Sequence, residues 1–166
     1  MNDIGFIVEE SPLILKALHE DAPSAWGDIT AQQMVEHLSL EIAYASKKIV
    51  PKSIVSTERM AFWKAKFFNN NIEIPKNFTA KGILEPGQVL PARFEGLPEA
   101  KWLYKISVDE FVQYFKKDIT RVTFHPFFGY LSYDEWVYYL SRHIRHHFAQ
   151  FGLLDVHGNK NKDLVY

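Results

Sequence analysis

The segment from Ser132 to Gly152 constrains the fold most, because it carries every local signal of one long helix. Ser132 and Glu135 have the spacing of a capping box, in which two side chains satisfy the first free N–H groups of a helix. Apolar residues then recur at helical spacing over some five turns, and Gly152 follows as a helix-ending glycine. The segment therefore predicts an amphipathic helix whose apolar side must be covered by other elements.

Three other helices are predicted, each from a polar cap followed by apolar residues at helical spacing. Their signals are Thr30 with Gln33, Ser11 with Pro12 at the first helical position, and Ser107 with Glu110. The first of them spans residues 28–50 and ends before Pro51. The shortest one is expected to present Leu13, Leu15 and Leu18 as its apolar side. The sequence thus favours an all-α fold.

Residues 51–106 are expected to form a crossover arm between the helices. Residues 56–68 are compatible with a further helix, whereas residues 69–98 are rich in Asn, Pro and Gly and are predicted as loop with at most a short strand. Long loops of this kind are often functional lids, but an arm that only covers the helices is the simpler interpretation. No repeat or linker divides the chain, so residues 1–166 are expected to form one domain with a loose tail at 158–166.

Composition excludes several classes of protein. Hydrophobic residues make up 47% of the chain, which is ample for a globular core, and the formal net charge of −1 gives no overall attraction to nucleic acid or anionic lipid. No apolar run has membrane-spanning length, and the first residues lack the pattern of a signal peptide, so a cytoplasmic protein is expected. Because the chain has no cysteine, any metal must be bound by nitrogen and oxygen.

A pair of histidines lies on the apolar side of the last predicted helix. On a helical wheel, His143 and His147 fall near the centre of the stripe that includes Trp136 and Leu140, while His146 lies on its flank. Two histidines four residues apart are separated by ~6 Å along the helix, so both imidazoles can reach one ion at ~2.0–2.1 Å. The alternative is that each ring forms a hydrogen bond with a neighbouring helix, and spacing alone leaves both interpretations open.

The predicted helix at 28–50 offers a third ligand. His37 shares a turn with Glu41 and Tyr44 at the edge of the apolar stripe. Three imidazoles and a water would form an open tetrahedral site, which is typical of catalytic rather than structural zinc. By spacing alone, His37 is equally compatible with a flank residue that bonds to Glu41 or to solvent.

Two segments resemble a known family. Residues 26–38, WGDITAQQMVEHL, and 125–152, HPFFGYLSYDEWVYYLSRHIRHHFAQFG, are similar to the DinB-like superfamily and cover about a quarter of the chain. The likeness is closest to a branch with an HP-x-FG-x-L-S/T-x-x-EW segment. The resemblance implies a DinB-like four-helix bundle with one metal-binding His on its second helix and an H-x-x-x-H pair on a later one. It assigns these roles to His37, His143 and His147, and places Gln150 beside them.

The resemblance also implies a class of function, although the short first helix and the arm at 69–106 depart from the family. The known activities of the family include metal-dependent transfer of small thiols, isomerisation and hydrolysis. We therefore expect a divalent transition metal, zinc or nickel first, that activates a water or thiol toward a small-molecule substrate. The alternative is a non-catalytic bundle that binds metal and a small ligand. A homodimer is left open.

Several polar residues near the predicted site are candidates for further roles. Glu41 could orient His37, accept a proton, or become a fourth ligand, and it is equally compatible with an ordinary surface carboxylate. His125 could contact substrate, but a packed turn is the favoured interpretation of its HPFFG segment. The residues proposed to line a substrate site are Tyr44, His125, Tyr139 and Gln150.

Overall fold

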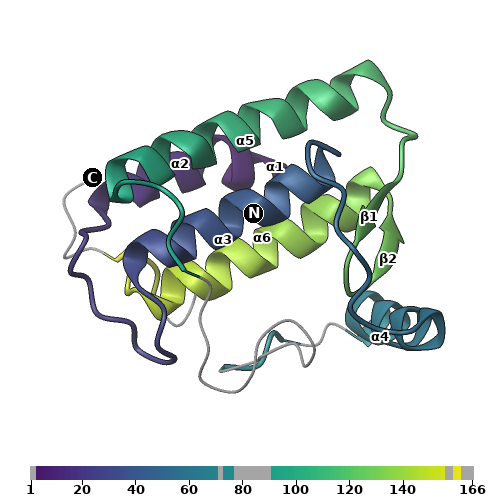
Figure 1. Ribbon diagram of the computed structural model, residues 1–166, viewed down its shortest axis with the longest axis horizontal. Helices are drawn as coiled ribbons and strands as arrows, with labels where there is room; N and C mark the ends of the chain where they lie inside the picture. Colours follow the sequence, from purple (N-terminus) through teal and green to yellow (C-terminus); the bar gives the residue numbers. More distant parts are fainter. Residues whose placement is uncertain (1–2, 71–72, 77–90, 156–158, 162–166) are drawn as a thin grey trace.

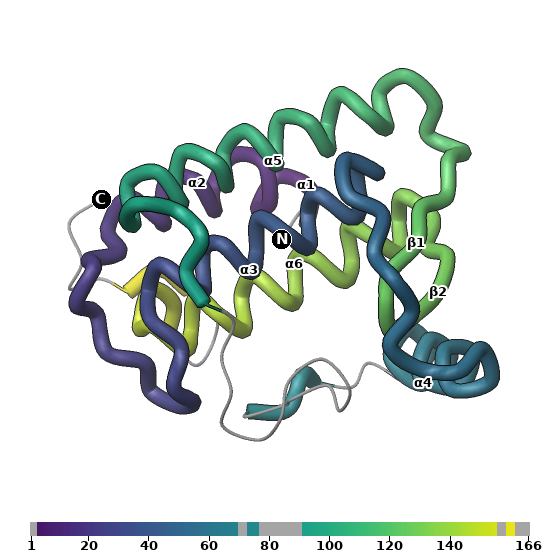
Figure 2. The backbone as a smooth tube through the Cα atoms, viewed as in Figure 1, coloured from purple at the N-terminus to yellow at the C-terminus, as the bar shows by residue number. Residues whose placement is uncertain are grey.

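A computed structural model describes residues 3–70, 73–76, 91–155 and 159–161, and within these ranges the protein is mostly helical with one small sheet (Figure 1). Three long helices lie side by side: α3 (Ala31–Ala45), α5 (Leu97–Lys117) and α6 (Tyr133–Gln150). The tube in Figure 2 shows α3 between α5 and α6 in this view. These helices enclose most of the described core, which includes Met34, Leu38, Phe111, Trp136 and Ile144.

A helical segment at the N-terminus packs against α5 and α6. It consists of α1 (Asp3–Gly5), a π-helical turn η1 (Phe6–Glu10), α2 (Ser11–Ile14) and a 3-10 turn η2 (Leu15–Ala17). The prediction that Ser11 is the N-cap of this helix is therefore wrong, since Glu10 before it is already helical and the Ser11 hydroxyl donates to the Ile7 carbonyl at 2.8 Å. Pro12 has no N–H to continue the α-helical bonding pattern, which accounts for the widened turn before it.

The apolar side of this segment also differs from the prediction. Leu15 and Leu18 are buried as expected, but Leu13 is 48% exposed and Ile14 is buried in its place. The earlier start of the helix at Asp3 adds Phe6 and Ile7 to the buried side.

Helix α3 begins where it is predicted and ends earlier. Its N-cap Thr30 forms the capping box with Gln33. The predicted continuation to residue 50 is wrong, because the helix ends at Ala45 and Lys47 adopts a positive φ of 56°. The N–H groups of Lys48 and Ile49 then both bond to the Ala43 carbonyl, which closes the helix end.

Helix α5 is longer than the prediction. It starts at Leu97, ten residues before the predicted cap Ser107, and Ser107 is buried inside it. The buried residues of α5 recur at helical spacing from its first residue, so the arm ends at Gly96 rather than at residue 106. Helix α6 agrees with its prediction: Ser132 and Glu135 form the capping box, and Gly152 has a φ of 67°.

A β-hairpin between α5 and α6 has no counterpart in the prediction. Strand β1 (Thr123–His125) pairs antiparallel with β2 (Gly129–Leu131), and His125 lies opposite Gly129. Helix α4 (Thr57–Asn70), which agrees with the expectation for residues 56–68, lies beside β2 at one end of the molecule (Figure 1). Lys64 of α4 donates to the Tyr130 carbonyl at 2.7 Å and joins the two elements.

The remaining arm and the tail are described only in part. Residues 71–72 and 77–90 of the expected loop lie outside the described ranges, as do 156–158 and 162–166 of the tail. The returning arm is anchored to α3, because the N–H groups of Arg93 and Phe94 donate to the buried Glu36 carboxylate at 2.8 and 3.2 Å. Part of the tail is paired rather than loose, since Lys160 forms a β-bridge with Leu154.

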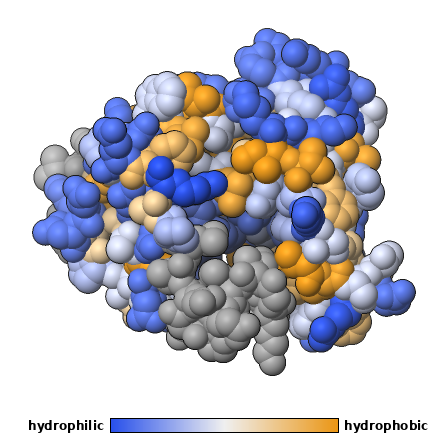
Figure 3. All heavy atoms as spheres, in the orientation of Figure 1, coloured by the Kyte–Doolittle hydropathy of each residue, from blue (hydrophilic) through white to orange (hydrophobic). Residues whose placement is uncertain are grey.

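The described surface is mixed in polarity. Figure 3 shows hydrophilic side chains over the C-terminal part of α5 and smaller apolar groups below it. Within the described ranges, no helix combines the length and apolar content that a membrane crossing requires.

Candidate metal centre

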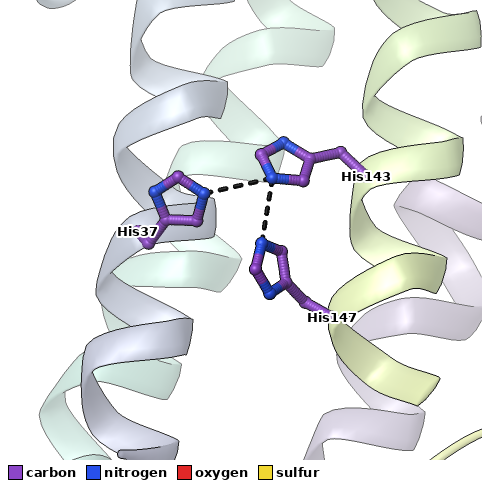
Figure 4. A group of neighbouring side chains, drawn as sticks. All are labelled: His37, His143 and His147. Atoms are coloured by element: carbon purple, nitrogen blue, oxygen red, sulfur yellow. Dashed lines mark hydrogen bonds between the residues drawn. The ribbon is translucent and has the colours of Figure 1, made fainter. Parts of the chain in front are cut away.

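Three histidines from two helices meet between α3 and α6. His37 lies in the middle of α3, and His143 and His147 lie on successive turns of α6 (Figure 4). The Nε2 atom of His143 is 3.1 Å from Nε2 of His37 and 3.0 Å from Nε2 of His147. One ligand atom from each residue lies within 4.8 Å of the others. Tetrahedral zinc ligands at ~2.0–2.1 Å from the ion are about 3.4 Å apart, so this spacing fits one ion.

The three residues are those that the sequence singles out. His143 is buried and His37 and His147 are partly buried, so the pair on α6 faces inward as predicted. His146 does not join them: its ring contacts Trp26 edge-on, with 5.4 Å between ring centroids. Within the described ranges, no other group of three potential ligands comes together.

Burial keeps these imidazoles in the form that binds metal. Desolvation lowers the pKa of His37, and it lowers the pKa of His143 and His147 well below the usual value, an effect to which neighbouring imidazoles add. Glu41 acts in the opposite direction on the pKa of His37. Only a neutral imidazole has a free lone pair, so the site is composed of available donors at neutral pH.

Gln150 determines which nitrogen of His147 carries the proton. Its Nε2 donates to the Trp26 carbonyl at 2.6 Å, which leaves its Oε1 atom 2.7 Å from Nδ1 of His147. Because an amide oxygen only accepts, the proton of His147 belongs on Nδ1 and the lone pair on Nε2. Gln150 is buried and orients a candidate ligand, and it lies beside His147 as the resemblance implies.

Tyr139 contacts Nδ1 of His143, and Glu41 contacts Tyr139 in turn. The Tyr139 hydroxyl lies 2.7 Å from Nδ1 of His143 and donates to Oε2 of Glu41 at 3.1 Å. Tyr139 is buried, and desolvation followed by the charge of Glu41 raises its pKa well above the usual value. Its hydroxyl is therefore protonated and engaged with other side chains.

Glu41 has other neighbours than those that the sequence suggests, which are the candidate metal site and His37. It lies outside the group of three ligand atoms, and no hydrogen bond joins it to His37 among the described residues. It is buried rather than on the surface, and its Oε2 atom is 3.2 Å from Nε2 of His125. Desolvation acts to raise the pKa of Glu41, but the contact with His125 and the charges of His125 and His37 outweigh it and lower the pKa below the usual value.

His125 has the role that the sequence favours. It belongs to a packed turn, because its Nδ1 accepts from the N–H groups of Phe127 and Phe128 at 3.1 Å each. Its other nitrogen faces Glu41. Tyr44 is half-buried beside the site, where desolvation and the charge of Glu41 raise its pKa. Contacts of Tyr44, His125, Tyr139 or Gln150 with a substrate stay predictions.

Some contributors have no signal in the sequence. Three of these contributors are backbone groups: the Trp26 carbonyl and the amides of Phe127 and Phe128. The residue type at these positions therefore does not reveal their role. No family model matches the chain, and comparison with curated proteins and with solved structures finds no match either.

Proposed function

We propose that this protein is a metal-dependent enzyme of the DinB-like type, in which His37, His143 and His147 bind one divalent transition ion, zinc or nickel first. The observation that carries the proposal is the convergence of three Nε2 atoms at 3.0 and 3.1 Å. The hydrogen bond from Nδ1 of His147 to Gln150 leaves the lone pair of His147 on Nε2, the atom that faces His143. Imidazole donors suit zinc, nickel, copper and iron and disfavour calcium and magnesium.

The arrangement of helices is compatible with this family. The N-terminal helical segment, α3, α5 and α6 supply four packed helical units, and the candidate ligands lie on the second and the last of them. In helical bundles, metal sites are formed by side chains that face each other between helices. We therefore propose a DinB-like four-helix bundle, with the N-terminal segment as its short first helix.

Three protein ligands leave a coordination position for a reactant. An ion held there would lower the pKa of a bound water or small thiol and so supply a nucleophile that the cysteine-free chain lacks. Glu41 is the proposed proton acceptor, because its Oε1 atom has no hydrogen bond to a described residue while Oε2 is engaged. Tyr44, beside Glu41, is proposed to contact the substrate, a small molecule that undergoes hydrolysis or thiol transfer.

The alternative is a bundle that binds metal and a small ligand without turnover. A fourth protein ligand would favour it, and Glu41 is not in the group of converging atoms. The enzyme is therefore the better supported proposal.

The test is a metal analysis of protein purified without chelator and without a nickel resin. We expect one transition ion per chain, or uptake of one ion on titration. A panel of esters, amides and cellular thiols with electrophilic acceptors should then show turnover that disappears on metal removal and returns on reloading. Absence of metal uptake contradicts the site, and turnover that survives metal removal contradicts the mechanism.

A further inference from the structure

A chain of polar contacts leads from the β-hairpin to His143. It begins at His125, whose Nδ1 accepts from two backbone N–H groups, those of Phe127 and Phe128. A nitrogen that accepts cannot carry a proton, so the proton of this ring lies on Nε2. That N–H is buried and has no hydrogen bond of good geometry among the described residues, and the group it faces is Oε2 of Glu41 at 3.2 Å.

The next two contacts determine where the protons of Tyr139 and His143 lie. An ionised carboxylate only accepts, so the single proton of the Tyr139 hydroxyl points to Oε2 of Glu41, 3.1 Å away. If that proton pointed to His143 instead, a phenolic lone pair would face the buried carboxylate. The Tyr139 oxygen can therefore only accept from His143, whose Nδ1 is 2.7 Å away. The proton of His143 is then on Nδ1 and its lone pair on Nε2, the atom that lies between His37 and His147.

We propose that His125, Glu41 and Tyr139 form a positioning relay that fixes the proton of His143 on Nδ1 and presents Nε2 as a metal ligand. The metal part rests on the proposed function, whereas the position of the proton on His143 does not. All four side chains are buried, so water does not replace a missing partner easily. The relay joins β1, α3 and α6, and so makes the ligand geometry depend on the hairpin.

The relay also distinguishes the three candidate ligands. His147 has its own partner in Gln150, while no hydrogen bond from Nδ1 of His37 reaches another described residue. Only His143 contacts both other imidazoles through Nε2. Loss of the relay should therefore disturb His143. Loss of the hydrogen-bond partner of a metal-binding histidine typically weakens metal affinity by about 10–100-fold.

The first measurement is the position of the proton on His143 in metal-free protein, from two-bond 1H–15N correlation spectra of the imidazoles. We expect a protonated Nδ1 and an unprotonated Nε2 in the wild type. Tyr139→Phe removes the acceptor, so Nε2–H should become populated, and Glu41→Gln should cause a smaller change in the same direction. The control Tyr133→Phe, a hydroxyl removal on the same helix, should change nothing. A wild-type proton on Nε2 would overturn the relay whether or not the protein binds metal.

The second measurement is the affinity for Zn²⁺ alone, by competition with a chromophoric chelator. Tyr139→Phe should weaken binding by about 10–100-fold and Glu41→Gln by less, while Tyr133→Phe binds like the wild type. Unchanged affinity and unchanged proton position in a folded variant overturn the relay, and Glu41→Gln decides the matter if Tyr139→Phe does not fold. If the wild type has its proton on Nδ1 but takes up no Zn²⁺, the relay stands and the proposed metal function fails.

Discussion

His146 and His147 are neighbours in sequence, but only His147 points its Nε2 atom at the other two imidazoles, while His146 lies against Trp26. We predict that metal stabilises the wild type against unfolding, by about 2.7 kcal/mol when its free concentration is a hundredfold above Kd. His147→Ala should lose most of this gain, and so should His37→Ala. His146→Ala should retain it, and the unfolding midpoint with and without metal measures all three. The reverse pattern, with the gain lost only in His146→Ala, would contradict the site.

Helix α6 carries two of the candidate ligands, so the stability of its first turn contributes to the stability of the site. The Ser132 hydroxyl accepts from the Glu135 N–H at 3.4 Å, and the Glu135 carboxylate accepts from the Ser132 N–H at 2.9 Å. Ser132→Ala removes one of these bonds and should reduce the free energy of unfolding by about 0.5–2 kcal/mol in urea titrations. Ser132→Asp, which also provides a capping oxygen, should recover most of it. Equal losses in both variants would show that the cap is not the cause.

Acid should destabilise the whole molecule through the buried imidazoles. The folded-state pKa values of His37, His143 and His147 lie below the usual value of 6.5 because of burial. Below about pH 6.5 the unfolded chain therefore takes up protons that the folded chain does not, and stability falls as pH falls. Glu41, whose pKa is also lowered, adds a further loss below its usual value of 4.5.

The corresponding measurement is the free energy of unfolding of metal-free protein between pH 7.5 and pH 5, by urea titration. Each imidazole contributes at most about 1.4 kcal/mol per pH unit, the value for one proton. His147→Gln should reduce the slope by up to this amount, and His146→Gln should reduce it by less, because desolvation lowers the pKa of His146 less far. A slope that does not change in His147→Gln would contradict the assignment of a neutral, buried His147. Metal should steepen the acid dependence, because protons compete for the same nitrogens.

Local chemistry was sufficient to predict the parts of the fold that depend on short spacings. The capping boxes at Thr30 and Ser132 and the glycine at 152 lie within the elements that they delimit, and all three are confirmed. The four-residue separation of His143 and His147 also needs only the geometry of a helix. These signals were enough to predict a mostly helical protein with two imidazoles facing inward.

Contacts between distant segments determined the parts of the fold and of the site that short spacings do not predict. His37 is 106 residues from His143, and Glu41 is 98 residues from Tyr139, so no spacing along the chain joins them. The end of α3 at Ala45 and the start of α5 at Leu97 depend on which apolar residues find a partner to pack against. The hairpin at 123–131 places the backbone amides that orient His125. The candidate ligands could thus be identified in the sequence, whereas the hydrogen bonds around them form only when α3, α6 and the hairpin pack together.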